Sequence, residues 1–171
     1  VALSPVAQGQ GAFPTKTIKL IIPFPAGGIN DVLGRIVADK LQAKWGQPII
    51  IENKTGAGGN IGADLVYNAP ADGHTLFISP PGPLSINQTL YKKPLYNAAT
   101  DFAPVGLVTE QPMVLIARKD FPADDMKGFI AHTKANAAKM QYASSGVGSG
   151  SHLTCARLNA AMGVDVTHVT Y

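Results

Sequence analysis

Two glycine-rich turns, each lying between an apolar strand pattern and a helical pattern, most constrain how this chain can fold. The first is Pro23 to Gly28, after the apolar run Ile18 to Ile22, and the second is Ser144 to Ser151, after Met140 to Ala143. Glycine allows close backbone approach, and the first turn of a helix leaves N–H groups unpaired at the positive end of the helix dipole. Each turn therefore predicts an anion-binding site, and together they predict a cleft that grips a small acid from both sides.

Composition excludes several classes of protein. The chain has 171 residues, of which 46% are hydrophobic and 15% charged, as in a packed soluble protein. Its apolar runs are too short to cross a bilayer, so no direct membrane insertion is expected. The net charge of +3 comes from scattered Lys and Arg rather than a basic stripe, which predicts no nucleic-acid partner. Cys155 stands alone and the four His residues lack metal-ligand spacing, so we expect no disulfide, no metal and no cofactor.

Strand and helix patterns alternate from Thr17 onward, which predicts an α/β fold with a mainly parallel sheet. Two strand patterns in succession, without a helix between them, predict a crossing between two lobes near residue 110. We therefore expect a leader or signal remnant at 1–13, a first α/β lobe at 14–109 and a second α/β lobe at 110–171. The expected strands are 18–22, 48–52, 75–79, 105–109, 113–117, 140–143 and 166–171, and the expected helices are 30–45, a short one ending at 67, 84–91, 124–137 and 152–162.

Several motifs, in order and at consistent spacing, resemble one known family. The motifs are Ile18 to Gly28 with Asp31, Ile51 to Gly62, Asp72 to Leu76, Ile86-Asn87 with Leu90-Tyr91, Asp101 to Val105, and Tyr142 to Gly146 with Ser151 to Leu153. They resemble the Bug family, the TctC-type substrate-binding receptors of tripartite tricarboxylate transporters. The resemblance extends from about Pro14 to Tyr171.

The resemblance implies a periplasmic-binding-protein-like (type II) architecture with two lobes around a cleft. It also implies a periplasmic receptor, not an enzyme, that clamps a small organic carboxylate and delivers it to the membrane subunits of a transporter. The ligand class would be a di- or tricarboxylate, an acidic amino acid or an aromatic acid. The second lobe and the return crossing are incomplete here, because the chain corresponds to about the first half of a family member. The pair Ile29-Asn30 replaces the usual Gly-Thr, and Pro80-Pro81-Gly82-Pro83 replaces a stretch of Ser, Thr and Gly.

The candidate ligand-binding residues come mainly from the two turns, and no catalytic residue is expected. Backbone N–H groups around Ala26 to Gly28, with N–H and hydroxyl groups around Ser144 to Ser151, would hold the carboxylate. Asp31 has a second interpretation as compensation for the helix dipole, and His152 as a polar cap residue. The candidates are Phe24, Pro25, Ala26, Gly27, Gly28, Asn30, Asp31, Ser79, Ser144, Ser145, Gly146, Ser149, Ser151 and His152.

Two alternatives stay open at the level of sequence. One is a Rossmann-type oxidoreductase, because Thr55 to Gly62 nearly matches a dinucleotide-binding turn. Against it, Asn60 occupies a required glycine position, and the catalytic pair of a Tyr followed four residues later by a Lys is absent from the sequence. The other is a truncated fragment that binds nothing, with an unpaired sheet edge in its incomplete second lobe.

Overall fold

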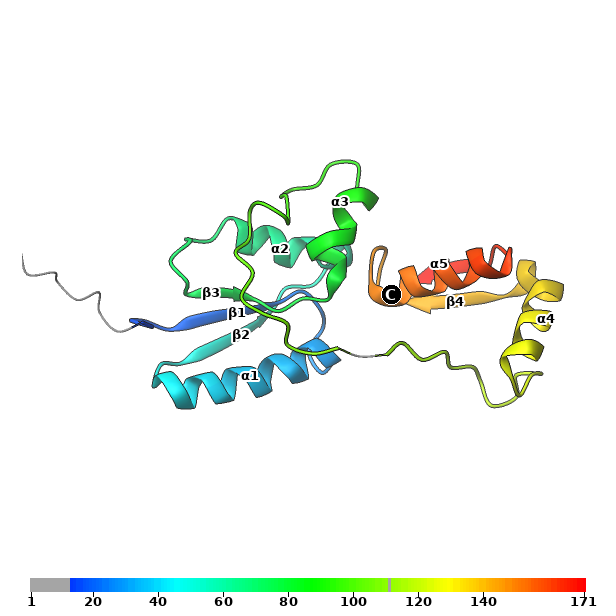
Figure 1. Ribbon diagram of the computed structural model, residues 1–171, viewed down its shortest axis with the longest axis horizontal. Coiled ribbons are helices and arrows are strands. Elements are labelled where there is room, and N and C mark those ends of the chain that lie inside the picture. The colour runs from blue at the N-terminus through cyan, green and yellow to red at the C-terminus, as the bar shows by residue number, and fades with distance from the viewer. Residues whose placement is uncertain (1–12, 111) are drawn as a thin grey trace, which may run out of the picture.

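The computed structural model describes residues 13–110 and 112–171. The first part of the chain forms a three-stranded parallel sheet in the order β2-β1-β3. Its strands are β1 (Ile18–Ile22), β2 (Ile49–Asn53) and β3 (Thr75–Phe77). Figure 1 shows α1 (Ile29–Trp45) on one face of this sheet and α2 (Asn60–Tyr67) on the other. We call this part the amino-terminal unit; it also contains η1 (Ala57–Gly59), η2 (Gly82–Ile86) and α3 (Asn87–Leu90).

The last part of the chain forms a second, smaller unit. It consists of α4 (Met126–Asn136), the short η3 (Ala137–Lys139), β4 (Gln141–Ser144), α5 (Gly150–Met162) and β5 (Thr167–Thr170). β4 and β5 pair in parallel, with Ser144 opposite Thr170, and α5 connects them. This is a βαβ unit, the arrangement expected when a helix must return the chain to the start of a parallel neighbour. We call it the carboxy-terminal unit.

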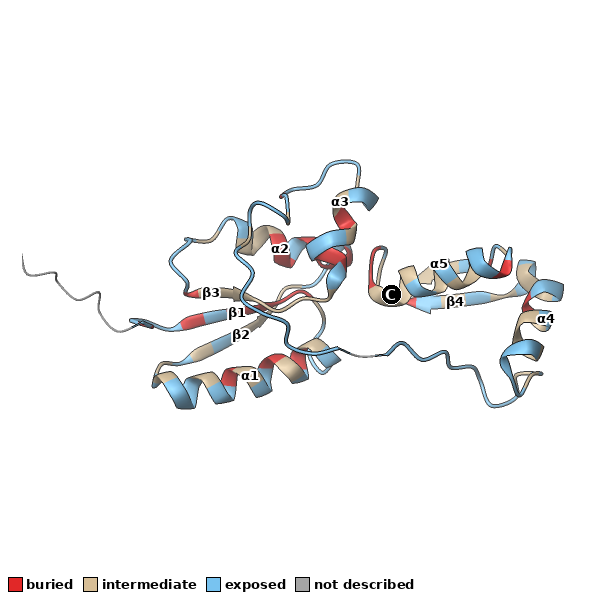
Figure 2. Ribbon diagram, in the orientation of Figure 1, coloured by how far each residue is buried: buried red, intermediate tan, exposed pale blue. Residues whose placement is uncertain are grey.

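The core of the amino-terminal unit is centred on β1. Ile18, Leu20, Ile21 and Ile22 are all buried, on both faces of the strand, because helices cover both sides of the sheet (Figure 2). Gly34 lets α1 approach this strand, since a methyl group there would lie 2.5 Å from Cδ1 of Ile22. Gly46, directly after the expected helix end at 45, ends α1 with φ 66°, in the left-handed conformation typical of a glycine helix terminator.

Most expected elements are confirmed within two or three residues, but the crossing is not built as expected. The expected strands at 105–109 and 113–117 are wrong: described residues 103–110 and 112–118 form an extended segment without regular structure. Val105 is 91% exposed and Ile116 is 85% exposed. A strand needs a hydrogen-bonded neighbour, and in the described part of the chain no strand pairs with this segment. Figure 1 shows it running between the two units.

The leader expected at 1–13 lies outside the described residues except for Phe13. The Phe13 ring packs edge-on against Trp45, with centroids 5.8 Å apart, and lies 5.0 Å from the ring of His74. The start of the described chain is thereby attached to the amino-terminal unit.

Candidate functional site

The first glycine turn leads from the buried end of β1 into α1 and is fixed by the Asp31 carboxylate. Asp31 is 3% exposed, and its Oδ2 accepts hydrogen bonds from the Gly27 N–H at 2.9 Å and from Nε of Arg35 at 3.0 Å. Its Oδ1 accepts from Nη2 of Arg35 and Nδ2 of Asn53, both at 3.1 Å. Asn53 also donates to the Phe24 carbonyl oxygen at 3.0 Å. Both carboxylate oxygens therefore hold the turn in place.

The electrostatics of Asp31 agree with this role. The hydrogen bond from Arg35, the backbone N–H of Gly27 and the amide of Asn53 lower the pKa of Asp31 to about 2. The carboxylate is therefore ionised throughout the neutral range. It lies in the first turn of α1, where the helix dipole favours a negative charge.

The structure determines which backbone N–H groups of the first turn are available to a ligand. The sequence predicts that the N–H groups of Gly27 and Gly28 are free to bind a ligand. Instead, the Gly27 N–H donates to Asp31, and the Gly28 N–H donates to the Pro25 carbonyl at 3.3 Å. Gly28 is the N-cap of α1 and makes no side-chain capping bond. The N–H groups of Ile29, Asn30 and Asp31 are the ones that helix geometry leaves without an internal acceptor. These three N–H groups are candidate donors in addition to the predicted range Ala26 to Gly28.

The second glycine turn, between β4 and α5, is held by its own side chains. Ser144 is buried, and its Oγ lies 2.6 Å from Nε2 of His168. Ser149, 1% exposed, caps α5 by accepting the N–H of His152 at 3.3 Å. The Gly148 N–H donates to Nδ1 of His152 at 3.2 Å. Ser151 contributes through its Oγ, 3.4 Å from the Ser145 N–H.

The second turn and the start of α5 leave two backbone N–H groups available to a ligand. The first N–H of α5 with an acceptor inside the helix is that of Leu153, which donates to the Ser149 carbonyl, so helix geometry leaves the N–H groups of Gly150 and Ser151 without an internal partner. The hydrogen bond from the Gly148 N–H favours the neutral form of His152, because Nδ1 accepts it only when unprotonated. Burial and the neighbouring His168 lower the pKa of His152, and the two rings stack with centroids 4.2 Å apart.

A third glycine loop, η1, lies between the two turns. A methyl group on Gly59 would lie 3.3 Å from Cβ of Pro23 in the first turn. A methyl group on the neighbouring Gly58 would collide with the carbonyl of Val147 in the second turn. This loop belongs to the segment that resembles a dinucleotide-binding turn. Its glycines are used for packing against both turns instead.

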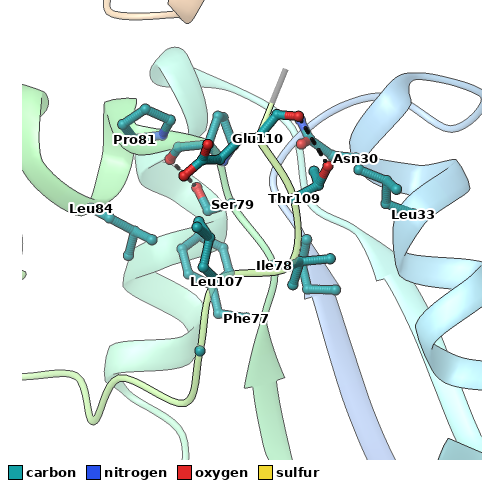
Figure 3. A pocket seen from close by; sticks show the side chains of 13 residues that line it. Asn30, Leu33, Phe77, Ile78, Ser79, Pro81, Leu84, Leu107, Thr109 and Glu110 are labelled. Carbon is teal, nitrogen blue, oxygen red and sulfur yellow. Dashed lines mark hydrogen bonds between the residues drawn. The ribbon is translucent and has the colours of Figure 1, made fainter.

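A pocket of about 460 Å³ opens at the carboxyl end of β3, beneath the extended segment 106–110 (Figure 3). Asn30 and Ser79 are the two predicted site residues that line it. Its other walls are mainly apolar, and the carboxylate of Glu110 is also part of its lining. The second turn contributes no residue to this pocket. Of the predicted site residues, Asn30 and Ser79 therefore lie in the pocket, whereas those of the second turn lie outside it.

Sequence reasoning missed residues that support the turns from outside them. Arg35 and Asn53 fix the first turn, His168 supports the second, and Tyr91 joins the second turn to the amino-terminal unit. The spacing Asp31 to Arg35, four residues along one helix, is a signal from which that pair was predictable. The other contacts span 22 to 56 residues of sequence and leave no local pattern.

Comparison with known proteins identifies the family. The model of the tripartite tricarboxylate transporter family receptor, TctC, matches residues 33–171. The chain belongs to this TctC receptor family. Among curated relatives of this TctC-family chain, a UPF0065 protein from the tcbD-tcbE intergenic region of Pseudomonas sp. (strain P51) is 38% identical over 165 residues, covering 96% of this chain and 49% of the relative.

Solved structures, among them that of the periplasmic binding protein BugD at 35% identity and a TM-score of 0.82, place the fold among periplasmic binding proteins. MatC from Rhodopseudomonas palustris with bound malate superposes with a TM-score of 0.87 at 38% identity, covering 93% of this chain and 54% of MatC. R. palustris Rpa4515 with adipate gives a TM-score of 0.80 at 34% identity, covering 93% of this chain and 53% of Rpa4515. The TctC-family chain described here spans about half the length of the curated relatives it matches.

Two patterns, that of a metal site and that of a membrane-spanning helix, are absent from the described residues of this TctC-family chain. Among the described residues there is no group of three or more His, Cys, Asp or Glu side chains arranged to hold a metal ion. No helix in residues 13–110 or 112–171 combines the length and apolar character needed to cross a bilayer.

Proposed function

We propose that this chain is the amino-terminal part of a periplasmic receptor that holds a small organic carboxylate for uptake by a tripartite tricarboxylate transporter. Residues 14–109 and 110–171 would form its two lobes. The observation that carries the proposal is a pair of helix N-termini, those of α1 and α5, each preceded by a rigid glycine turn. Membership of the TctC receptor family supports it.

In this proposal both lobes donate backbone N–H groups to one carboxylate. The first lobe uses the N–H groups of Ile29 and Asn30, and the second uses those of Gly150 and Ser151. Hydrogen bonds to a charged acceptor contribute about 1.5–3 kcal/mol each, so four of them offset the cost of ordering and reach roughly micromolar affinity. The ligand is bound and released unchanged.

The other predicted residues shape or support this site. Asp31 and His152 act through the backbone groups that they hold, rather than through contact with the ligand. Asn30 and Ser79 would contact the body of the ligand from the pocket at β3. The proposed ligand-contacting surface also includes residues of the two turns, namely Phe24, Pro25, Ala26, Gly27, Gly28, Ser145, Gly146 and Ser151. The buried Ser144 and Ser149 would support the second turn from within.

Two solved relatives make the ligand class concrete. MatC holds malate and Rpa4515 holds adipate, both of which are dicarboxylates. By analogy we propose a small organic acid of this kind for the present chain. The Rossmann alternative receives no support, because the glycines of its candidate turn are packed against Pro23, Pro83 and Val147, where a pyrophosphate would have to approach.

A thermal-shift screen tests this function. The probes are malate, adipate, citrate and aspartate, applied to this chain and to a version extended to the length of its relatives. We expect at least one probe to raise the Tm of the extended protein in proportion to the logarithm of its concentration. Absence of any shift in both proteins would overturn the receptor proposal. A shift in the extended protein alone would show that the remaining half of the receptor is needed to complete the site.

A further inference from the structure

The second glycine turn packs directly against the amino-terminal unit along a narrow contact that we call the seam. The seam consists of Gly82, Asn87 and Tyr91 on one side and Val147 and Gly148 on the other. The Tyr91 hydroxyl donates a hydrogen bond to the Val147 carbonyl oxygen at 3.0 Å. Within residues 13–110 and 112–171, it is the one hydrogen bond that joins the two units.

At the seam, the glycine backbone of the second turn lies against Gly82 and the Asn87 side chain, with no space for a further side chain. A methyl group on Gly82 would lie 2.6 Å from the Gly148 carbonyl oxygen. A methyl group on Gly148, which has φ +86°, would collide with Oδ1 of Asn87. The Gly148 carbonyl oxygen is a backbone atom, and the Asn87 side chain is held by its own buried hydrogen bonds, so neither atom moves aside easily. The absence of a Cβ at Gly82, like its absence at Gly58, therefore sets how closely the second turn approaches.

The amino-terminal side of the seam is rigid. Asn87 is 1% exposed, and its Nδ2 donates to Oδ1 of Asn60 at 2.7 Å and to the Gly58 carbonyl at 3.3 Å. The Tyr96 hydroxyl lies 3.0 Å from the same Asn60 oxygen and 2.7 Å from the Pro83 carbonyl. This buried network fixes the surface on which the second turn rests.

One atom of that network opposes the contact. Oδ1 of Asn87 is buried without a hydrogen-bond partner and is covered by Gly148. A buried acceptor without a partner is unfavourable, and water would satisfy it if the second turn moved away. The seam thus combines one favourable hydrogen bond with one unsatisfied acceptor, which partly offset each other.

We propose that the seam sets the separation of the two units and that Tyr91 is a positioning residue for ligand binding. Tyr91 holds the second turn, and with it the N-terminus of α5, at the distance where both units reach one ligand. Gly82 permits that distance. The inference rests on the proposed function only in its effect on the ligand; the effect on the separation of the units stands without it.

The separation is measured with spin labels in the ligand-free chain. The labels are attached at Lys40→Cys on α1 and Arg157→Cys on α5, both exposed, in a Cys155→Ser background. We expect Tyr91→Phe and Gly82→Ala to shift the distance distribution to longer values and to broaden it. The controls are Tyr67→Phe, which removes an exposed hydroxyl, and Ser85→Ala, an exposed position in η2. Both should reproduce the parent distribution. Unchanged distances in Tyr91→Phe and Gly82→Ala would overturn the proposal.

Titration calorimetry with malate, in a version extended to the length of its relatives, then separates this inference from the proposed function. If malate binds, Tyr91→Phe should weaken it about twofold to tenfold, the loss of one hydrogen bond, while Tyr67→Phe leaves it unchanged. Equal affinity in Tyr91→Phe and the parent would overturn the positioning role. If neither malate nor any other acid of the screen binds, the receptor proposal fails, and the label distances still decide whether the seam sets the separation.

Discussion

At the scale of single residues, Asp31 shows how a buried charge shapes a turn. Arg35, Gly27 and Asn53 lower its pKa to about 2, below the value of 3.8 of a free aspartate. A carboxylate whose pKa is lowered by folding stabilises the folded state above the unfolded pKa, and that stabilisation is lost as pH falls through the folded pKa. The first turn is therefore expected to be stable at every pH of physiological interest and to loosen only in strong acid.

Asn53 supplies the link between β2 and this carboxylate, and its removal gives the first prediction. Asn53→Ala deletes hydrogen bonds to Asp31 and to the Phe24 carbonyl. We expect the Tm to fall by about 3–6 °C, because hydrogen bonds to a charged group are among the stronger ones. The matched control is Asn68→Ala, which breaks an exposed Asn–Asp pair with Asp64 and should change the Tm little. Equal effects of the two substitutions, measured by thermal unfolding, would contradict the role given to Asn53.

His152 gives a prediction for pH dependence. Burial and the adjacent His168 lower its pKa below 6.5, so folding favours the neutral ring that accepts the Gly148 hydrogen. The unfolded chain binds this proton more readily, and stability must therefore fall as pH drops below about 6.5. We expect urea unfolding midpoints to decrease from pH 7.5 to 5.5 by more in the parent than in His152→Gln, whose amide oxygen can accept without titrating. A larger decrease in the variant would contradict this assignment.

At the scale of elements, the local pattern was enough where an apolar run or a helix terminator marks the element. Helix α1 ends at Gly46 as predicted, and β1 was identified by its apolar run. The crossing was not predictable, because the alternation around Val105 and Ile116 describes a strand that finds no pairing partner in the described chain. The support of the turns by Tyr91 and His168 was also beyond sequence reasoning, since each contact depends on the packing of distant segments.

Close packing of α2 against the first turn gives a prediction at this scale. A methyl group at Gly62 would lie 2.9 Å from Cβ of Pro23 and 3.0 Å from the Lys54 carbonyl oxygen. Gly62→Ala should lower the free energy of unfolding by about 1–3 kcal/mol, because overpacking outweighs the higher helix propensity of alanine. At Gly150, the first residue of α5, nothing lies within 4 Å of such a methyl group. Gly150→Ala should be neutral or stabilising by up to about 1 kcal/mol. Denaturant unfolding of both variants checks the contrast, and a stabilised Gly62→Ala would contradict it.

At the scale of the whole molecule, two units meet through glycine loops and are otherwise connected by an extended segment (Figure 1). The contacts place η1 between the first and second turns, so the three loops form one continuous glycine-lined region. The relatives are about twice as long as this chain. We propose that, in a protein of that length, the half that this chain does not match covers the positions of exposed apolar residues such as Val105, Leu107 and Ile116. The present chain would then supply the N–H groups that bind the ligand, and the other half would complete both sheets.

The central claim is that backbone N–H groups at two helix N-termini bind a carboxylate. Calorimetric titration of the extended protein with malate, and with malamide, in which both carboxylates are replaced by neutral amides, tests it most directly. We expect a malate Kd of about 1 μM and binding of malamide weaker by at least about tenfold, because the charged acceptors are lost. Equal affinity for the acid and the amide would contradict it.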